Sequence, residues 1–201
     1  FAPIPTVMTD PTLHHVHCAD TAEGHRMAWW QWGDAQAPRL IVCAHGLSRQ
    51  GRDFDVLARA LLARGEQQGR ALRVVCPDVV GRGESDWLKD PLGYQFPTYV
   101  ADMLAMLGAL QAQAPIGAFD WVGTSMGGLI GMMLAGTPQL PLPVPVRRLV
   151  LNDVGPAVEW TALQRIGEYL GKAGTFDSIE TAAATMRAIS LGFGPHTDEQ
   201  W

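Results

Sequence analysis

One stretch of the sequence decides the fold: Phe119-Asp120-Trp121-Val122-Gly123-Thr124-Ser125-Met126-Gly127-Gly128. It predicts a short apolar strand, a sharp turn that carries Ser125, and then a buried helix. Side chains with a Cβ two residues before or after the serine would collide in such a turn, which explains Gly123 and Gly127. The first N–H groups of the helix would point toward the serine, where they favour a developing negative charge.

The residues around this turn support a strand–turn–helix unit. Val122 closes an apolar run, and residues 129–135 are apolar or glycine on every side, as expected of a buried helix. The alternative is a tight turn with an incidental serine, and the Gly-x-Ser-x-Gly pattern alone does not exclude it. The context makes Ser125 the candidate nucleophile.

Composition limits the possible partners. The 201 residues suit one domain, or one domain with a small insertion, and 47% of them are hydrophobic, which allows a substantial core. The net charge is −5, and Arg147-Arg148 is the only adjacent basic pair, so we expect no nucleic-acid partner. No apolar run reaches the roughly 18 residues that a membrane helix needs, so we expect no membrane partner.

The three cysteines indicate a reducing compartment. Cys18, Cys43 and Cys76 all fall in strand-like runs, and their number is odd. Buried free thiols are typical of cytoplasmic proteins, so we expect a cytoplasmic location. No Cys-x-x-Cys pair is present to bind a metal.

Strands and helices alternate along most of the chain. Besides the strand before Ser125, apolar runs predict strands over 13–19, 26–32, 40–44, 72–76 and 146–152. Apolar residues at helical spacing predict helices around 54–62 and 99–110. This alternation is typical of the α/β class, with a mostly parallel sheet flanked by helices.

The pattern changes after Gly155-Pro156, where no further strand-like run follows. A helical stripe runs from Trp160 to Leu170, and the capping box Asp177-Ser178-Ile179-Glu180 predicts the start of another helix. Thr197 to Gln200 resembles a third helix start. We therefore expect two domains, a core over residues 1–155 and part of a helical lid over 156–201.

Three histidines near the N-terminus raise the question of a metal site. His15 and His17 would share one face of a strand that also carries His14, but no carboxylate or further histidine is placed to complete a site. We interpret them as a solvated hairpin, and we expect neither a metal nor another cofactor.

Four motifs occur in an order that resembles the α/β-hydrolase superfamily, in its branch of lidded serine esterases and carbon–carbon-bond hydrolases. The resemblance covers roughly residues 26–160. The motifs are His45-Gly46, Asp78-x-x-Gly81-x-Gly83-x-Ser85, Gly123-x-Ser125-x-Gly127-Gly128 and Leu151-Asn152-Asp153-x-Gly155-Pro156.

The resemblance implies a role for each residue of the site. Ser125 would be the nucleophile, and the backbone N–H groups of Leu47 and Met126 would form the oxyanion hole. His45 and Gly46, like Gly123 and Gly127 of the turn, would shape the loops around it.

The base and the acid are harder to place. The family order is nucleophile, acid and then histidine, but the only histidine after Ser125 is His196, too early to follow a last strand. Asp153 is either a variant acid or a capping residue at the junction to the lid. We expect the catalytic histidine to lie outside these residues, in a longer polypeptide of which this sequence is the N-terminal part, truncated before the last strands.

Three functions remain open at this stage. The first is a serine hydrolase that cleaves a carboxylester, thioester or lactone of a small-molecule substrate through Ser125. The second is a carbon–carbon-bond hydrolase of the same fold, and the third is a ligand-binding protein that has lost the chemistry. Aromatic residues in the lid region indicate an apolar substrate: Trp160, Phe176, Phe193 and Trp201.

Overall fold

The structure is a computed structural model that describes residues 10–20, 23–169, 175–190, 192, 194 and 197–198. Contacts divide the chain into two compact units, one up to Ala157 and one from Val158, and each is described by itself. Several predictions fall on residues outside this description: His196, Phe193, Trp201 and the end of the helix start at 197–200.

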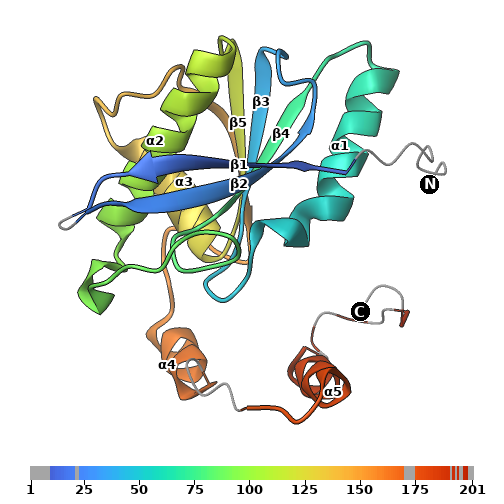
Figure 1. Cartoon of the computed structure of the whole chain (residues 1–201), viewed down its shortest axis with the longest axis vertical. Helices are drawn as coiled ribbons and strands as arrows, with labels where there is room; N and C mark the ends of the chain where they lie inside the picture. Colours follow the sequence, from blue (N-terminus) through green and yellow to red (C-terminus); the bar gives the residue numbers. More distant parts are fainter. Residues whose placement is uncertain are drawn as a thin grey trace. The chain divides into compact units, whose positions relative to one another are not determined.

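The first unit is built on a six-stranded sheet with the order β1-β2-β4-β3-β5-β6 (Figure 1). β1 pairs antiparallel with β2 and β2 with β4, whereas the pairs β4–β3, β3–β5 and β5–β6 are parallel. The predicted α/β fold is therefore confirmed, as a mixed sheet with an antiparallel edge. The strands are β1 (Thr12–Cys18), β2 (His25–Gly33), β3 (Arg39–Ala44), β4 (Arg73–Asp78), β5 (Ala118–Thr124) and β6 (Val146–Asn152).

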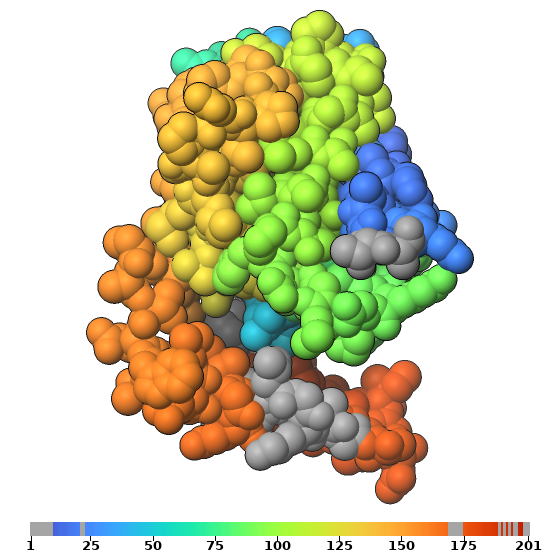
Figure 2. Space-filling view, turned by 90° about the vertical axis from the view of Figure 1, so that its left-hand side faces the viewer, coloured from blue at the N-terminus to red at the C-terminus, as the bar shows by residue number. Residues whose placement is uncertain are grey.

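Helices cover both faces of the sheet. α1 (Asp55–Gln67), preceded by the short 3-10 helix η1 (Gly51–Phe54), lies on one face. α2 (Phe96–Gln113) and α3 (Met126–Gly136) lie on the other, where Figure 2 shows their surfaces adjoining. A second 3-10 helix, η2 (Pro91–Gly93), precedes α2.

Two buried clusters form because the central strands face helices on both sides. Val42 of β3 and Val75 of β4 belong to the larger cluster, under α2 and α3. Ile41 and Val74 point the other way and pack with Phe54 in the smaller cluster, under α1. Burial on both faces explains why β3 and β4 are continuous apolar runs rather than alternating ones.

The second unit contains two described helices, α4 (Trp160–Tyr169) and α5 (Ile179–Ile189). The N-cap of α5 is Ser178, whose Oγ accepts from the Thr181 N–H at 3.2 Å. The predicted capping box placed the N-cap at Asp177 and the residue three positions later at Glu180. In the structure both positions come one residue later, at Ser178 and Thr181. No helix in the described part of the chain is long and apolar enough to cross a membrane.

A buried arginine joins the sheet to the end of α2. Arg73 at the start of β4 is fully buried, and its guanidinium donates to the carbonyls of Ala35 and Leu110 at 3.2 Å and of Ala114 at 3.3 Å. Burial lowers the pKa of Arg73. The Leu110 carbonyl also accepts from the Ala114 N–H, whereas the Ala114 carbonyl lies past the last turn of α2, so this side chain caps the helix end from a distant strand.

We expect Arg73→Met to reduce the free energy of unfolding by about 2–4 kcal/mol, because the buried bonds to the Leu110 and Ala114 carbonyls and the part-buried bond to the Ala35 carbonyl lose their charged donor. Chemical denaturation measures the change. Arg64→Met is the control, since Arg64 is exposed on α1 and should change stability by less than about 0.5 kcal/mol. Equal, small effects of the two variants would contradict the capping role.

Candidate active site

Ser125 lies at the sharp turn between β5 and α3, with φ 48° and ψ −115°. A residue with a side chain rarely adopts a positive φ, and such strain is concentrated at functional sites. The backbone is held on both sides: the Ser125 N–H donates to the Asn152 carbonyl at 2.9 Å, and the Ser125 carbonyl accepts from the Gly128 N–H at 2.9 Å. The side chain is partly exposed.

The glycines of the turn are required by close backbone contacts. A Cβ at Gly123 would lie 2.4 Å from the Gly127 carbonyl oxygen. A Cβ at Gly127 would lie 2.1 Å from the carbonyl oxygen of Ala44. The predicted collision at Gly127 is therefore with β3, a strand that the Gly-x-Ser-x-Gly pattern does not itself indicate.

Trp121 stabilises the turn from within the buried core, a role that the sequence did not indicate. Its indole Nε1–H donates to the Gly127 carbonyl at 2.9 Å, and the side chain is fully buried. A Cβ at Gly131 would lie 2.4 Å from the same indole ring. The ring thus packs under the first two turns of α3.

The loop after β3 runs beside Ser125. An added Cβ at Gly46 would lie 3.7 Å from the Ser125 Cβ, an ordinary contact, so no protein atom enforces glycine there. The loop-shaping role that the resemblance implies for Gly46 stays a prediction. Leu47 follows directly, and neither its N–H nor that of Met126 donates to another residue that the structure describes.

His45 fastens this loop to the next one. Its Nε2 accepts from the Val79 N–H at 3.0 Å, so the proton is assigned to Nδ1, which donates to the Gly46 carbonyl at 2.7 Å. Burial lowers the pKa of His45, and Arg82 lowers it further, against the Gly46 bond and the charge of Asp78. The ring is buried and neutral, with both nitrogens engaged.

The loop after β4 is organised around Asp78. The buried carboxylate accepts from the Gly51 N–H at 2.6 Å, the Glu84 N–H at 3.0 Å and the Trp30 indole at 3.2 Å. A Cβ at Gly83 would lie 2.3 Å from this carboxylate. These contacts explain the aspartate and the second glycine of the predicted loop motif.

Arg82 of the same loop contacts the two residues whose N–H groups are the candidate oxyanion donors, Leu47 and Met126. Its Nε donates to the Leu47 carbonyl at 2.9 Å, and its Nη2 lies 4.0 Å from the Met126 sulfur. A third contact joins Nη1 to the Val80 carbonyl at 2.7 Å. Apart from the position of Arg82 between Gly81 and Gly83, no sequence pattern indicated this role.

Asp153 follows β6, which lies next to β5, the strand that ends just before Ser125. Asn152 pairs with Thr124 in the sheet, which places Asp153 at the same edge as the serine. Its φ is 55°, it is exposed, and its side chain forms no hydrogen bond with another described residue. The structure thus brings Asp153 to the edge where Ser125 lies, and it places no described histidine in contact with it.

Metal-ligating side chains gather away from this site. Among the described residues, one group has donor atoms within 4.8 Å of one another: Cys18, His25 and Asp102, all buried. The His25 ring contacts Asp102 at 3.0 Å and Asp20 at 3.3 Å, and burial raises the pKa of both Cys18 and Asp102. Both ring nitrogens of His25 therefore have hydrogen-bond partners, and the ring joins β2 to α2. His14, His15 and His17 take no part in such a group.

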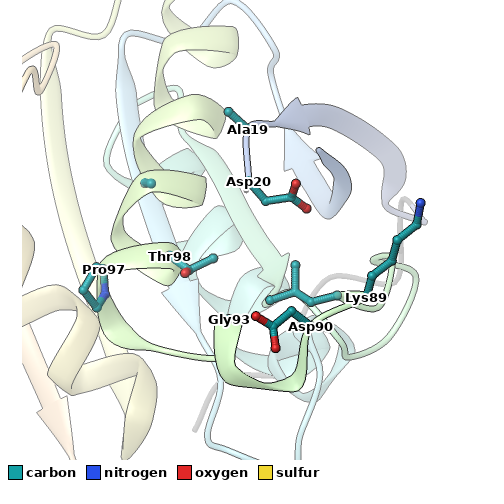
Figure 3. Close-up of a pocket in the computed structure, with 9 residues that line it drawn as sticks. Ala19, Asp20, Lys89, Asp90, Gly93, Pro97 and Thr98 are labelled. Carbon is teal, nitrogen blue, oxygen red and sulfur yellow. The ribbon is translucent and has the colours of Figure 1, made fainter. Parts of the chain in front are cut away.

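A surface pocket of about 350 Å³ lies next to this cluster (Figure 3). Asp20 lines it from the loop after β1, and Pro97 and Thr98 line it from the start of α2. It contains neither Ser125 nor the loop after β3, so we do not assign the chemistry to it.

We expect Gly127→Ala to cost 1–3 kcal/mol of stability and most of the activity, because the new Cβ would collide with the Ala44 carbonyl. Gly136→Ala in the same helix meets no atom within 4 Å and is the matched control, expected to be neutral or stabilising. Denaturation and turnover of the two variants test this. A stable, fully active Gly127→Ala protein would exclude the tight turn.

His45 should also make stability depend on pH. Because its pKa is lowered in the folded state, the unfolded chain takes up a proton first, near pH 6.5. Stability should be full above that pH and fall as the pH decreases below it, by at most about 1.4 kcal/mol per pH unit. His45→Asn, which keeps a donor for the Gly46 carbonyl, should be less stable at pH 7.5 but show a shallower slope between pH 6.5 and 5. Identical slopes would show that the His45 ring takes up its proton as readily in the folded protein as in the unfolded chain.

Comparisons with known proteins agree with this geometry. The family model of the alpha/beta hydrolase fold matches residues 39–170. A 3-hydroxybutyrate-oligomer hydrolase of Cupriavidus necator is 50% identical over 191 residues, which are 95% of this chain and 60% of that protein. A serine hydrolase-like protein of Danio rerio is 33% identical over 61% of this chain and 32% of its own length.

A solved structure shows the same architecture. An alpha/beta hydrolase from Novosphingobium aromaticivorans superimposes with a TM-score of 0.69 and 34% identity, over 90% of this chain and 57% of that one. The chain thus spans about 60% or less of the length of each of these relatives. Because the family model covers more than half of the sequence and the sheet order agrees with it, the chain belongs to the α/β hydrolase fold family.

Proposed function

We propose that this chain is part of a serine hydrolase that cleaves carboxylic ester bonds through Ser125. The observation that supports it most is the strained backbone of Ser125, with φ 48° at the start of a buried helix. A protein that only binds a ligand gains nothing from such a turn, whereas a nucleophile needs its hydroxyl exposed at the sheet edge.

In the proposed mechanism the Ser125 hydroxyl attacks the ester carbonyl. The N–H groups of Leu47 and Met126 then stabilise the negative oxygen of the tetrahedral intermediate, each by about 3 kcal/mol. Collapse of the intermediate expels the alcohol and leaves an acyl-enzyme, which water hydrolyses.

The hydroxyl also needs a base, which the family supplies as a histidine oriented by an acid. His45 is unsuitable, because both of its ring nitrogens are engaged by the backbone. We propose Asp153 as the acid, on the grounds of its place at the carboxyl end of β6 beside the serine turn. The histidine is assigned to a part of the protein beyond the described residues.

The substrate class follows from the relative with half of its residues in common. That protein is named for the hydrolysis of 3-hydroxybutyrate oligomers, which are linear oligoesters. We propose short oligoesters of hydroxy acids as substrates, and this favours ester cleavage over carbon–carbon cleavage.

We propose that the unit from Val158 is part of a helical lid. Trp160 and Leu163 of α4 are 68% and 45% exposed, as apolar residues that cover a ligand would be. Phe176 is 38% exposed in the same unit.

We also propose a cytoplasmic location for the protein. The three buried free cysteines support this proposal, because free thiols are typical of a reducing compartment.

Replacement of Ser125 by alanine tests the nucleophile. In the full-length protein, Ser125→Ala should lower kcat by several powers of ten and abolish labelling by a fluorophosphonate, while the thermal unfolding temperature stays the same or rises because strain is relieved. Ser178→Ala, which removes a serine from the cap of α5, should retain the label. Labelling of another serine, with Ser125 unmodified, would overturn the assignment.

The substrate proposal has its own test. Purified full-length protein should release monomer from the dimer and trimer of 3-hydroxybutyrate faster than it cleaves long-chain p-nitrophenyl esters. A preference for long-chain esters would reject the oligoester class and leave Ser125 as nucleophile.

A further inference from the structure

A second pocket of about 270 Å³ lies between the loop after β3 and the loop after β4. It is polar and is lined by side chains of both signs of charge: Ser48, Arg49, Gln50, Asp53, Arg82 and Gly83. Its walls continue directly from Leu47, one of the two proposed oxyanion donors. A group bound here would therefore lie next to the reacting ester.

The side chains that line this pocket carry two positive charges, on Arg49 and Arg82, and one negative charge, on Asp53. Arg49 is neutralised by Asp53, since its Nε and Nη2 lie 2.5 and 3.1 Å from the two carboxylate oxygens. Arg82 forms no ion pair with any carboxylate in the described part of the chain, and Asp78 already accepts three hydrogen bonds from other groups. Two guanidinium groups thus face a single lining carboxylate.

Neutral groups hold Arg82 in place. Its Nε and Nη1 donate to the carbonyls of Leu47 and Val80, and its guanidinium carbon lies 5.8 Å from the ring of Tyr94 and 5.5 Å from that of Tyr99. The contact of Nη2 is with the Met126 sulfur, a weak acceptor. The cation is therefore fixed in position, with Nη2 still able to donate to a stronger acceptor.

These observations together point to an anion site. A positioned guanidinium binds a carboxylate strongly and with defined geometry, and its ordering cost has already been met by the neutral contacts. The Ser48 hydroxyl on the opposite loop offers a second donor.

We propose that the pocket around Arg82 and Ser48 binds the free carboxylate of the substrate, so that the enzyme selects oligoesters with an unesterified acid end. This inference rests on the proposed ester hydrolysis and specifies which end of the substrate lies beside the oxyanion hole. Neutral esters would bind to the same site without this contact.

The test compares two substrates in the full-length protein, the 3-hydroxybutyrate dimer and its methyl ester. Arg82→Gln should raise KM for the free acid, so that kcat/KM falls about 10- to 100-fold more for the free acid than for the methyl ester, because any loss through the Leu47 carbonyl is common to both substrates. Arg64→Gln, with the same change of net charge on exposed α1, should affect neither substrate.

An equal loss for both substrates, carried by kcat, would overturn the proposal. Arg82 would then only hold the Leu47 carbonyl, and the proposed ester hydrolysis would stand. Failure of the wild-type protein to cleave either substrate would instead reject the oligoester class.

A binding measurement decides the proposal independently of turnover. Calorimetric titration of 3-hydroxybutyrate into the Ser125→Ala protein should show saturable binding that is at least about 10-fold weaker in the Ser125→Ala, Arg82→Gln double variant. Binding unchanged by the second substitution, or no binding to either protein, would overturn the carboxylate site.

Discussion

The rest of the site depends on the conformation of one residue, Ser125. A positive φ costs a residue with a side chain about 1–3 kcal/mol, so it persists only where the surrounding contacts allow no alternative. Here the Trp121 indole bonds the Gly127 carbonyl, and the Ala44 carbonyl fills the space where a Gly127 side chain would lie. Relaxing the turn would separate α3 from both β3 and β5, which is why the strain remains at the serine.

Two side chains connect the loops that surround this turn, and they do so in opposite directions. His45 starts from β3 and accepts from the Val79 N–H beyond β4, whereas Arg82 starts from the loop after β4 and donates to the Leu47 carbonyl beyond β3. Neither loop can move without breaking a buried or half-buried bond. The position of the Leu47 N–H relative to Ser125 is thus fixed by the sheet.

The sequence predicted most of the fold because its signals are local. Strands expected over 26–32 and 146–152 are found at His25–Gly33 and Val146–Asn152, since apolar runs and turn residues set such limits directly. The contacts it could not predict join residues far apart in sequence, such as Arg73 with Leu110, or His25 with Asp102. Even at Gly127, the pattern indicated crowding but not that β3 causes it. The functional assignment of Ser125, Leu47 and Met126 remains a prediction.

The two arginines of the polar pocket show why a count of charges does not reveal a binding site. Arg49 lies four residues before Asp53, so a local ion pair neutralises it and leaves it little to offer a ligand. Arg82 lies between two glycines, and among the described residues its contacts are with carbonyls, a thioether, the Tyr99 hydroxyl and aromatic rings, none of them charged. Such neutral partners fix a guanidinium without cancelling its charge.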